Sequence, residues 1–423
     1  MSAIDDWTEC AEALRDELVA AGKLTSPEWQ AAVLAVPRHA FVPQFYQRGT
    51  DPGPRNWELV SASSPDTRER WWNEVWANTS LVTQLGPVGR WGHQVVTGPS
   101  SSSSAPSLMT RMLEALDIRD GHRVLEIGTG SGYNAALMSH RLGDQNVFSV
   151  DVDAELVECA RDRLTALGYR PTLAAADGVT GLPQHAPYDR IIATCAVSRV
   201  PWSWAEQTTE GGLILVDVKP SASVGNLVLL RRETDRLEGR FDYGYATFMH
   251  MRTPAFPTEP KARPSRDHDK AQRSTTTLRT ERLWENAPLW FLLHLWEGGR
   301  VEHGYAMDPA TGRPGPVFFS SQDGSWCELS IASADGTREV WEGGPVDCGR
   351  TSRRRHSSGI NWASPDGAGL ASPPGPMTNK WSGSTSQPVG IAGLCHSNGE
   401  RPRRENPRCS RTAARRGRHQ SPR

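Results

Sequence analysis

Three closely spaced glycines stand where an apolar segment gives way to a helix-forming one, within Val124–Tyr133. Because glycine has no Cβ, such a turn lets the backbone approach a bound ligand closely. Apolar strand, tight glycine turn and helix start are the parts of a nucleotide-binding α/β unit. A glycine turn alone is also compatible with a structural strand–helix connection. The neighbouring segments therefore determine whether it is a cofactor site. The candidate cofactor-binding residues of this segment are Glu126, Gly128, Thr129, Gly130, Gly132 and Tyr133.

Acidic residues follow the next two apolar segments, as a nucleotide site requires. Residues 146–151 end in Asp151, at the place where such folds put the carboxylate that accepts hydrogen bonds from ribose hydroxyls. Residues 171–176 are followed by Asp177 and Gly178, which we expect on the adenine side. Each acid alone could be a solvated loop carboxylate. Their order, at strand ends where open α/β sheets bind ligands, favours a cofactor site.

The same alternation continues along the chain and sets the fold class. Apolar segments at 188–194 and 211–218 read as further strands, and helical stretches lie at 134–141, 154–168 and 201–209. Strands that alternate with helices predict an α/β fold, with a parallel sheet covered on both faces.

The rest of the chain divides by composition. We expect a helical N-terminal cap and loop region over 1–98, with loops dominating 51–95, and a cofactor-binding domain over 99–252. Within it, Ser100–Ser104 has a linker's composition, although a functional loop is equally compatible with its position before a helix over 105–116. Residues 253–274 read as a linker and 275–345 as a partial, small α+β domain without a chemical motif.

Overall composition is that of an enzyme of the cytoplasm. The chain has 423 residues and a net charge of −1, which argues against a nucleic-acid or membrane partner for the whole chain. Its seven cysteines lack metal-ligand spacing, so we expect no metal site and no disulfide framework, and Cys195 reads as a packing residue. The N-terminus has no apolar signal core, and no segment is long and apolar enough to span a bilayer.

The last part of the chain differs sharply from the rest. Residues 346–423 carry 14 lysines and arginines against 4 acids, whereas the preceding residues carry 33 against 44. Glycine, serine, proline and arginine dominate, which predicts a disordered basic tail. One interpretation is a nucleic-acid-binding arm. The other, which we prefer, is translation in a shifted reading frame, because one back-translation of 359–387 read two nucleotides along yields a globular-looking sequence.

With these residues in place, the chain resembles the protein-L-isoaspartate O-methyltransferase family from about residue 8 to 250. Ala35–Val42 is similar to that family's N-terminal signature, and Val124–Tyr133 to its motif I. The resemblance implies a Rossmann-like fold, S-adenosylmethionine (SAM) as cofactor, and a peptide or protein substrate bearing aspartyl or isoaspartyl carboxylates. It also implies that Ser104 positions the substrate carboxylate. Ala105 departs from the family's glutamine, which affects part of the expected substrate contact.

One subgroup is similar over further segments. The serine run, residues 120–124, 134–137 and 186–197 and the additional C-terminal domain resemble actinobacterial methyltransferases of ATP-grasp peptide maturase systems. That resemblance implies methylation of an aspartate in a modified ribosomal peptide, followed by closure to an aspartimide. The shifted-frame sequence also resembles the end of that subgroup's C-terminal domain.

Three functions therefore stay open. A repair enzyme would accept isoaspartyl sites in peptides of varied sequence. A maturation enzyme would need its own modified precursor. A third possibility is a SAM-binding protein without methyl transfer, suggested by Ala105 and by the composition of the tail.

Overall fold

The structure is a computed structural model, and it describes fourteen stretches of the chain. They are residues 7–49, 57–91, 94–220, 225–241, 246, 248–253, 266–276, 291, 301–307, 314–321, 324–331, 333, 335–344 and, near the end, 379–381.

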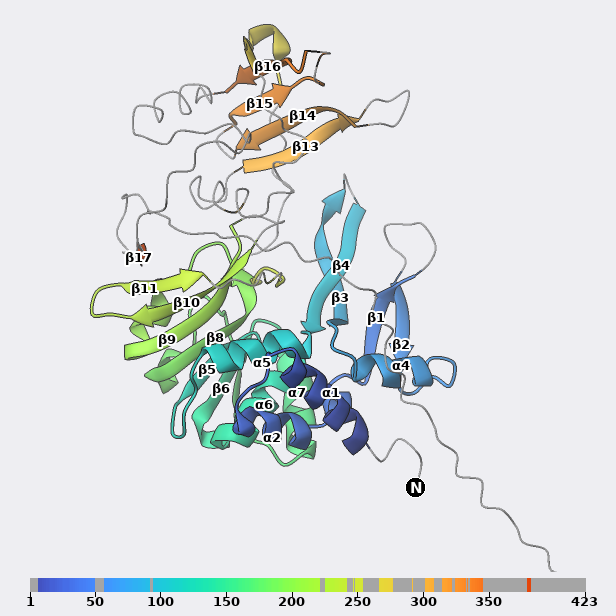
Figure 1. Cartoon of the computed structure of the whole chain (residues 1–423), viewed down its shortest axis with the longest axis vertical. Coiled ribbons are helices and arrows are strands. Elements are labelled where there is room, and N and C mark those ends of the chain that lie inside the picture. The colour runs from blue at the N-terminus through green and yellow to red at the C-terminus, as the bar shows by residue number, and fades with distance from the viewer. Residues whose placement is uncertain are drawn as a thin grey trace, which may run out of the picture.

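The centre of the protein is an eight-stranded sheet with the order β17-β11-β10-β9-β8-β5-β6-β7 (Figure 1). The strands from β7 to β9 run parallel, and β10, β11 and β17 extend the sheet antiparallel. This confirms the predicted parallel α/β core. The strands are β5 (Val124–Ile127), β6 (Val147–Asp151), β7 (Thr172–Ala175), β8 (Tyr188–Val197), β9 (Thr208–Val218), β10 (Asn226–Arg232), β11 (Leu237–Phe241) and β17 (Asn379–Trp381).

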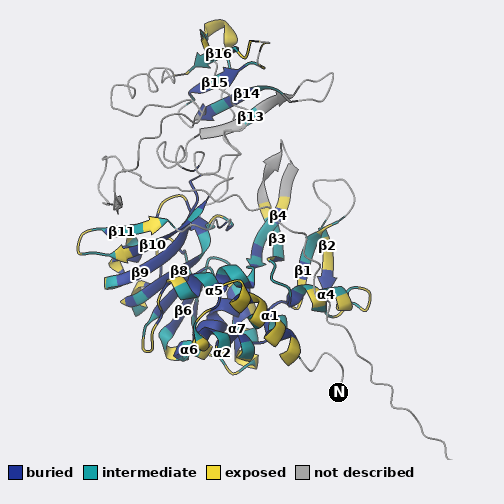
Figure 2. Ribbon diagram, in the orientation of Figure 1, coloured by how far each residue is buried: buried dark blue, intermediate teal, exposed yellow. Residues whose placement is uncertain are grey.

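Both faces of this sheet are buried along its central strands β5, β6, β8 and β9, most of whose residues are dark in Figure 2. Consecutive residues of a strand point to opposite faces, so Ile191 and Ile192 of β8 belong to two different apolar clusters. One cluster includes residues of α5 (Pro106–Ala115), α6 (Tyr133–Leu142) and α7 (Ala154–Ala166), and the other includes α8 (Trp202–Glu206). Because helices cover both faces, the sheet is doubly wound and Rossmann-like.

The N-terminal part combines four helices with a small sheet of order β2-β1-β3-β4. The helices expected in this cap are present, whereas the prediction of loops over 51–95 is wrong for the described residues. The elements are α1 (Thr8–Ala20), α2 (Pro27–Ala35), α3 (Arg38–Phe41), β1 (Gln44–Arg48), β2 (Trp57–Ser61), α4 (Arg68–Val75), β3 (Leu81–Trp91) and β4 (Gln94–Ser103).

The serine run is a strand rather than a linker. Its first four residues end β4, where Ser101 and Ser103 are buried and Ser102 is partly exposed. That alternation is the period of a half-buried strand, hidden in the sequence because every residue is serine. Thr83 Oγ1 and Ser101 Oγ are hydrogen bonded across the β3–β4 hairpin at 3.1 Å, which satisfies a buried hydroxyl.

The C-terminal part contains a separate antiparallel sheet of order β12-β16-β15-β14-β13. Its first strand begins at Gln272, inside the stretch predicted as a linker. Three short 3₁₀ helices complete the described elements: η1 (Asp144–Asn146), η2 (Pro183–His185) and η3 (His268–Lys270). The strands of this sheet are β12 (Gln272–Thr276), β13 (Val301–Met307), β14 (Pro314–Ser321), β15 (Trp326–Leu329) and β16 (Arg338–Gly343).

Most of the predicted tail lies outside the described residues. The exception is β17, whose three residues pair with β11, so a strand interrupts the stretch predicted to be disordered. The frameshift and basic-arm interpretations both stay predictions. Among the described helices, none combines the length and apolar character needed to cross a membrane.

Candidate cofactor and substrate site

The glycine turn between β5 and α6 can be built only with glycine at its critical positions. Gly128 has a φ of +105°, and a Cβ there would lie 2.7 Å from Thr194 Oγ1 of β8. Gly132, with a φ of +88°, packs against Ala160 of α7. The turn is fixed to β6 because the N–H groups of Gly128 and Thr129 both donate to the Val150 carbonyl, at 2.8 and 3.1 Å. The expected close approach of backbone to a ligand therefore has a structural basis.

Glu126, the acid before the glycines, is buried, and both of its carboxylate oxygens accept hydrogen bonds. Its carboxylate accepts hydrogen bonds from Asn134 Nδ2 at 2.8 Å and Ser149 Oγ at 2.6 Å. Burial raises the pKa of Glu126 to about 7, although both hydrogen bonds favour the ionised form. Ser149 also shares a hydrogen bond of 2.7 Å with Thr129 Oγ1, so the acid and the glycine turn form one polar cluster.

Asp151 ends β6 directly beside the glycine turn. Its Oδ2 accepts a hydrogen bond of 3.1 Å from the N–H of Gly130, and its Oδ1 one of 3.1 Å from the N–H of Asp153. These bonds fix the carboxylate plane at the carboxyl end of the strand. These backbone contacts thus orient the residue predicted to bind ribose toward the glycine turn.

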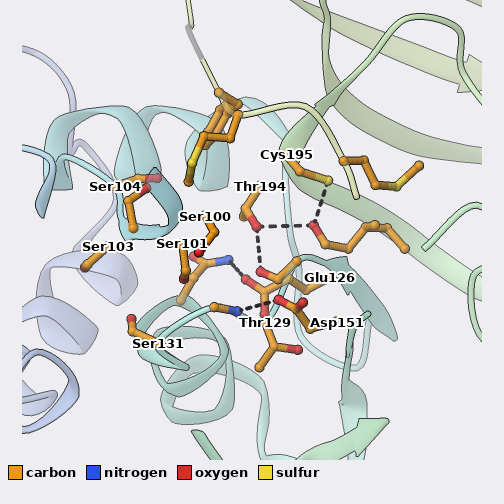
Figure 3. Close-up of a pocket in the computed structure, with 18 of the residues that line it drawn as sticks. Ser100, Ser101, Ser103, Ser104, Glu126, Thr129, Ser131, Asp151, Thr194 and Cys195 are labelled. Carbon is orange, nitrogen blue, oxygen red and sulfur yellow. Dashed lines mark hydrogen bonds between the residues drawn. The ribbon is translucent and has the colours of Figure 1, made fainter. Parts of the chain in front are cut away.

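A cavity of about 410 Å³ lies over these carboxyl ends (Figure 3). Its volume is within the range of small-molecule and cofactor sites. The serine run of β4 borders it on one side and the ends of β5, β6 and β8 on the other. The predicted site residues that line it are Ser104, Glu126, Gly128, Thr129, Gly130, Tyr133, Asp151 and Gly178.

Two predicted residues do not line the cavity. Gly132 shapes the turn from behind, against α7. Asp177 uses its Oδ1 to accept the N–H of Val179 at 3.0 Å, the geometry of a local turn. Its neighbour Gly178 does border the cavity, and the adenine-side role of Asp177 stays a prediction.

Ser104 borders the cavity at the end of the serine run, and Arg38 holds its backbone. The Arg38 guanidinium is buried and donates to the carbonyls of Val75, Ala77, Thr79 and Ser104 at 2.8, 2.9, 2.9 and 3.3 Å. Burial lowers its pKa to about 10, which leaves it charged at neutral pH. In the sequence, Arg38 stands out only as part of the Ala35–Val42 signature. Its function in the structure is to position the Ser104 segment.

The segment Phe248–Arg252, which is not among the predicted site residues, closes another side of the cavity. Two backbone hydrogen bonds tie it to Ala196 of β8, from Ala196 N–H to Met249 at 2.8 Å and from Met251 N–H to Ala196 at 2.7 Å. Asp217 of β9 accepts the N–H of Phe248 at 3.0 Å. No sequence pattern marks this segment, because its partners lie on strands far away in the chain.

Cys195 lines the cavity without the features of a nucleophile. Its Sγ lies 3.6 Å from the Ile127 carbonyl, and burial raises the pKa of the thiol. A thiol with a raised pKa stays protonated and unreactive. The prediction that Cys195 is a packing residue agrees with this environment.

The cavity suits a nucleoside-containing cofactor. A fixed carboxylate at the end of β6 can accept two hydroxyl hydrogen bonds, and the glycine turn leaves room for a ligand against the backbone. With the sheet order and the family match, these features identify a SAM-dependent methyltransferase.

Comparison with known proteins places this methyltransferase more narrowly. The profile of the Protein-L-isoaspartate(D-aspartate) O-methyltransferase family matches residues 86–243. The protein-L-isoaspartate O-methyltransferase of Methylorubrum populi is 39% identical over 154 residues, which are 36% of this chain and 71% of that protein. The chain belongs to the protein-L-isoaspartate O-methyltransferase family.

Other relatives match over different shares of their length. The protein-L-isoaspartate O-methyltransferase of Ignicoccus hospitalis is 44% identical over 124 residues, 29% of this chain and 59% of that protein. That of Methanopyrus kandleri is 33% identical over 210 residues, 49% of this chain and 76% of that protein. A solved protein-L-isoaspartate O-methyltransferase aligns with a TM-score of 0.47 at 22% identity, covering 83% of this chain and 93% of its own.

Proposed function

We propose that this protein transfers a methyl group from SAM to an aspartyl or isoaspartyl carboxylate in a peptide or protein. The observation that carries the proposal is that one cavity is bordered both by Asp151, the candidate ribose ligand, and by Ser104, the candidate substrate ligand. Family membership supports the reaction class. Glu126, Gly128, Thr129, Gly130 and Tyr133 complete the proposed cofactor side, together with Gly178.

The chemistry asks little of the protein beyond positioning. A carboxylate with a reference pKa of about 3.9 is ionised at neutral pH and needs no general base. The cofactor supplies an activated methyl group on a sulfonium. A carboxylate oxygen forms the new O–CH₃ bond while the S–CH₃ bond breaks. Holding the reacting groups in line contributes on the order of 7–11 kcal/mol in well-oriented intramolecular reactions.

Ser104 is suited to orient the nucleophile. A serine hydroxyl donates one hydrogen bond to a carboxylate and leaves its charge in place. The four-carbonyl anchor of Arg38 limits movement of the Ser104 backbone. The fold therefore positions the two reactants with different elements. The methyl donor is held at the ends of β5 and β6, and the substrate is held at the end of β4.

Esterification then makes the carbonyl carbon reactive. The neighbouring backbone amide nitrogen attacks it, methanol leaves, and a succinimide forms. In repair, hydrolysis of that ring restores some normal aspartate. In peptide maturation the ring is itself the product.

A second candidate is maturation of a dedicated ribosomal peptide that an ATP-grasp enzyme has modified. The observation that favours it is the five-stranded sheet β12–β16, which lies beyond the residues matched by the family profile. An added domain offers surface for one particular substrate. A neighbouring ATP-grasp gene and a short precursor gene would favour this candidate over general repair.

An assay of labelled methyl transfer tests the proposal. The purified chain is incubated with SAM carrying a tritiated methyl group and an isoaspartyl peptide, with the matching aspartyl and asparaginyl peptides alongside. Repair predicts label on the isoaspartyl peptide. If none of these peptides is labelled, the result favours a dedicated substrate. If a modified precursor peptide is not labelled either, the result favours SAM binding without methyl transfer.

A further inference from the structure

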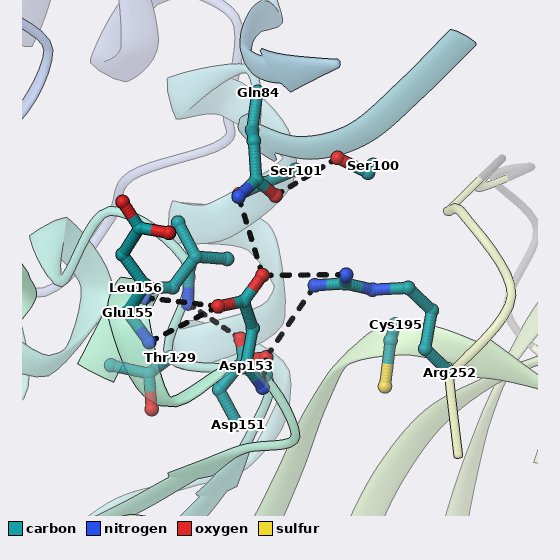
Figure 4. A network of polar contacts seen from close by, with 12 residues as sticks. Gln84, Ser100, Ser101, Thr129, Asp151, Asp153, Glu155, Leu156, Cys195 and Arg252 are labelled. Atoms are coloured by element: carbon teal, nitrogen blue, oxygen red, sulfur yellow. Dashed lines mark hydrogen bonds and ion pairs between the residues drawn. The ribbon is translucent and has the colours of Figure 1, made fainter. Parts of the chain in front are cut away.

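Arg252 lies at the lip of the cavity and faces two carboxylates (Figure 4). Its guanidinium nitrogens are 3.7 Å from Asp151 Oδ1 and 3.5 Å from Asp153 Oδ2. The Arg252 side chain is 39% exposed, while those of Asp151 and Asp153 are 11% and 21% exposed. Asp151, the candidate ribose ligand, is thus paired with a cation at the cavity.

The two acids are held by other partners, and Arg252 is their loosest contact. Asp153 Oδ1 caps α7 by accepting the N–H groups of Glu155 and Leu156 at 3.1 and 3.3 Å, and Gln84 Nε2 donates to its Oδ2 at 3.2 Å. Burial works to raise the pKa of Asp153, but these hydrogen bonds and the Arg252 charge outweigh it and hold the pKa below its usual value. Ion pairs as long and exposed as those of Arg252 contribute little stability and exchange readily.

The backbone that carries Arg252 is nevertheless firmly placed. The preceding residues pair with Ala196 of β8, and the Phe248 carbonyl accepts a hydrogen bond of 2.9 Å from Lys219 Nζ. The Cα position of Arg252 is therefore fixed at the cavity, while its long side chain can reorient. Among the described residues that line the cavity, Arg252 is the single lysine or arginine.

A substrate carboxylate that enters this cavity meets a negative environment. Asp151 lines the cavity, and Asp153 lies immediately beside it, so an approaching anion is repelled unless a cation accompanies it. An arginine fork can bind a carboxylate with two hydrogen bonds and select it over a neutral amide. Arg252 is placed to provide that fork.

We propose that Arg252 binds the substrate carboxylate, and that it becomes available when cofactor ribose hydroxyls replace it on Asp151. The inference rests on the proposed function, because it deepens the substrate side of the same site. Ribose hydroxyls that hydrogen bond to the Asp151 carboxylate would replace an Arg252 ion pair that is only 3.7 Å long at Oδ1. Cofactor binding therefore turns the guanidinium toward the peptide. The order of binding is cofactor first and peptide second.

The test compares Arg252→Gln and Arg252→Lys with Arg119→Gln as a matched control. Arg119 pairs with Asp117 at 2.7 Å on an exposed surface and does not line the cavity. Calorimetry measures SAM affinity, and steady-state kinetics measure KM and kcat for an isoaspartyl peptide. Fluorescence anisotropy then compares that labelled peptide with its carboxamide analogue in the presence of S-adenosylhomocysteine.

For Arg252→Gln we expect a peptide KM raised about tenfold or more, with Arg252→Lys between it and the wild type. The variant loses the preference for carboxylate over carboxamide, and its SAM affinity equals or exceeds that of the wild type because Asp151 has lost a competitor. Arg119→Gln changes none of these values. An unchanged peptide KM, or a tenfold loss of SAM affinity in Arg252→Gln, overturns the inference.

The wild-type protein separates this inference from the proposed function. If the wild type methylates the isoaspartyl peptide and Arg252→Gln does so with the same KM, the function stands and Arg252 has no substrate role. If the wild type binds SAM but methylates no peptide, the proposed function fails. The SAM affinity of Arg252→Gln still tests whether Arg252 competes with the cofactor for Asp151, because that measurement needs no turnover. A higher affinity supports the competition, and a tenfold loss contradicts it.

Discussion

The guanidinium of Arg38 donates a hydrogen bond of 3.3 Å to the carbonyl of Ser104, 66 residues further along the chain. This bond joins the start of α3 to the end of the serine run at the cavity. The same guanidinium holds three carbonyls at and after the end of α4. One buried cation thus connects the N-terminal part of the protein to the proposed substrate side of the site.

Replacing Arg38 should therefore affect both stability and turnover. Arg38→Met leaves four carbonyls without their donor, and we expect it to lower the free energy of unfolding by on the order of 3 kcal/mol. Urea unfolding measures this change. Arg70→Met, which removes an exposed ion pair with Glu58, is the control and should change stability little. Equal stabilities for the two variants would contradict the anchoring function of Arg38.

Removing the Asp151 carboxylate should weaken cofactor binding. Asp151→Ala leaves two ribose hydroxyls without a charged acceptor, and such hydrogen bonds contribute roughly 1.5–3 kcal/mol, so SAM affinity should fall more than about tenfold. Calorimetry gives the affinity directly. Asp162→Ala, on the exposed face of α7, is the control. Unchanged SAM affinity in Asp151→Ala would remove Asp151 from the cofactor site.

Ser104 should matter for transfer and not for the cofactor. Because its hydroxyl borders the cavity and is proposed to orient the substrate, Ser104→Ala should lower methyl transfer with little change in SAM affinity. Single-turnover rates at saturating SAM separate the two effects. Ser107→Ala, at the second residue of α5 and outside the cavity lining, should keep the wild-type rate. Equal rates for Ser104→Ala and the wild type would mean that Ser104 is structural.

Glu126 should make stability depend on pH near neutrality. Burial raises its pKa from 4.5 to about 7 in the folded protein, so the folded state holds the proton more tightly than the unfolded chain. Stability from this group is therefore lost as pH rises from the unfolded to the folded pKa. Glu126→Gln removes that loss.

The expected signature is a difference between Glu126→Gln and the wild type that grows with pH. Between about pH 5 and about pH 8, the unfolding free energy of the variant should gain about 2–3 kcal/mol on that of the wild type. Asp217, whose pKa burial raises to about 6, titrates in both proteins and cancels in the difference. A constant difference over this range would mean that Glu126 is ionised in the folded protein throughout.

The cofactor half of the site could be predicted from sequence because its signals are local. Gly128 and Glu126 lie within one strand–turn–helix segment, and Asp151 follows at the spacing that the next strand imposes. The apolar runs that form β5, β6 and β8 are short and buried on both faces, which is the pattern of a parallel sheet.

On the substrate half, the family resemblance indicates Ser104, but the residues around it could not be predicted because their partners are distant in sequence. In β4, buried Ser101 and Ser103 alternate with the more exposed Ser102, but the sequence hides this because all three are serine. The strand itself depends on pairing with β3. The functions of Arg38 and Arg252 depend on carbonyls and carboxylates brought near by the fold. No local pattern in the chain indicates either contact.

Base-labile methylation tests the central claim most directly. The protein is incubated with SAM carrying a tritiated methyl group and an isoaspartyl peptide, and the methanol released from the peptide by mild base is counted. The account predicts volatile tritium from the isoaspartyl peptide, little from the asparaginyl peptide, and a large loss of signal with Ser104→Ala. No volatile tritium from the isoaspartyl peptide or from a modified precursor peptide, in a preparation that calorimetry shows to bind SAM, would contradict methyl transfer to a carboxylate.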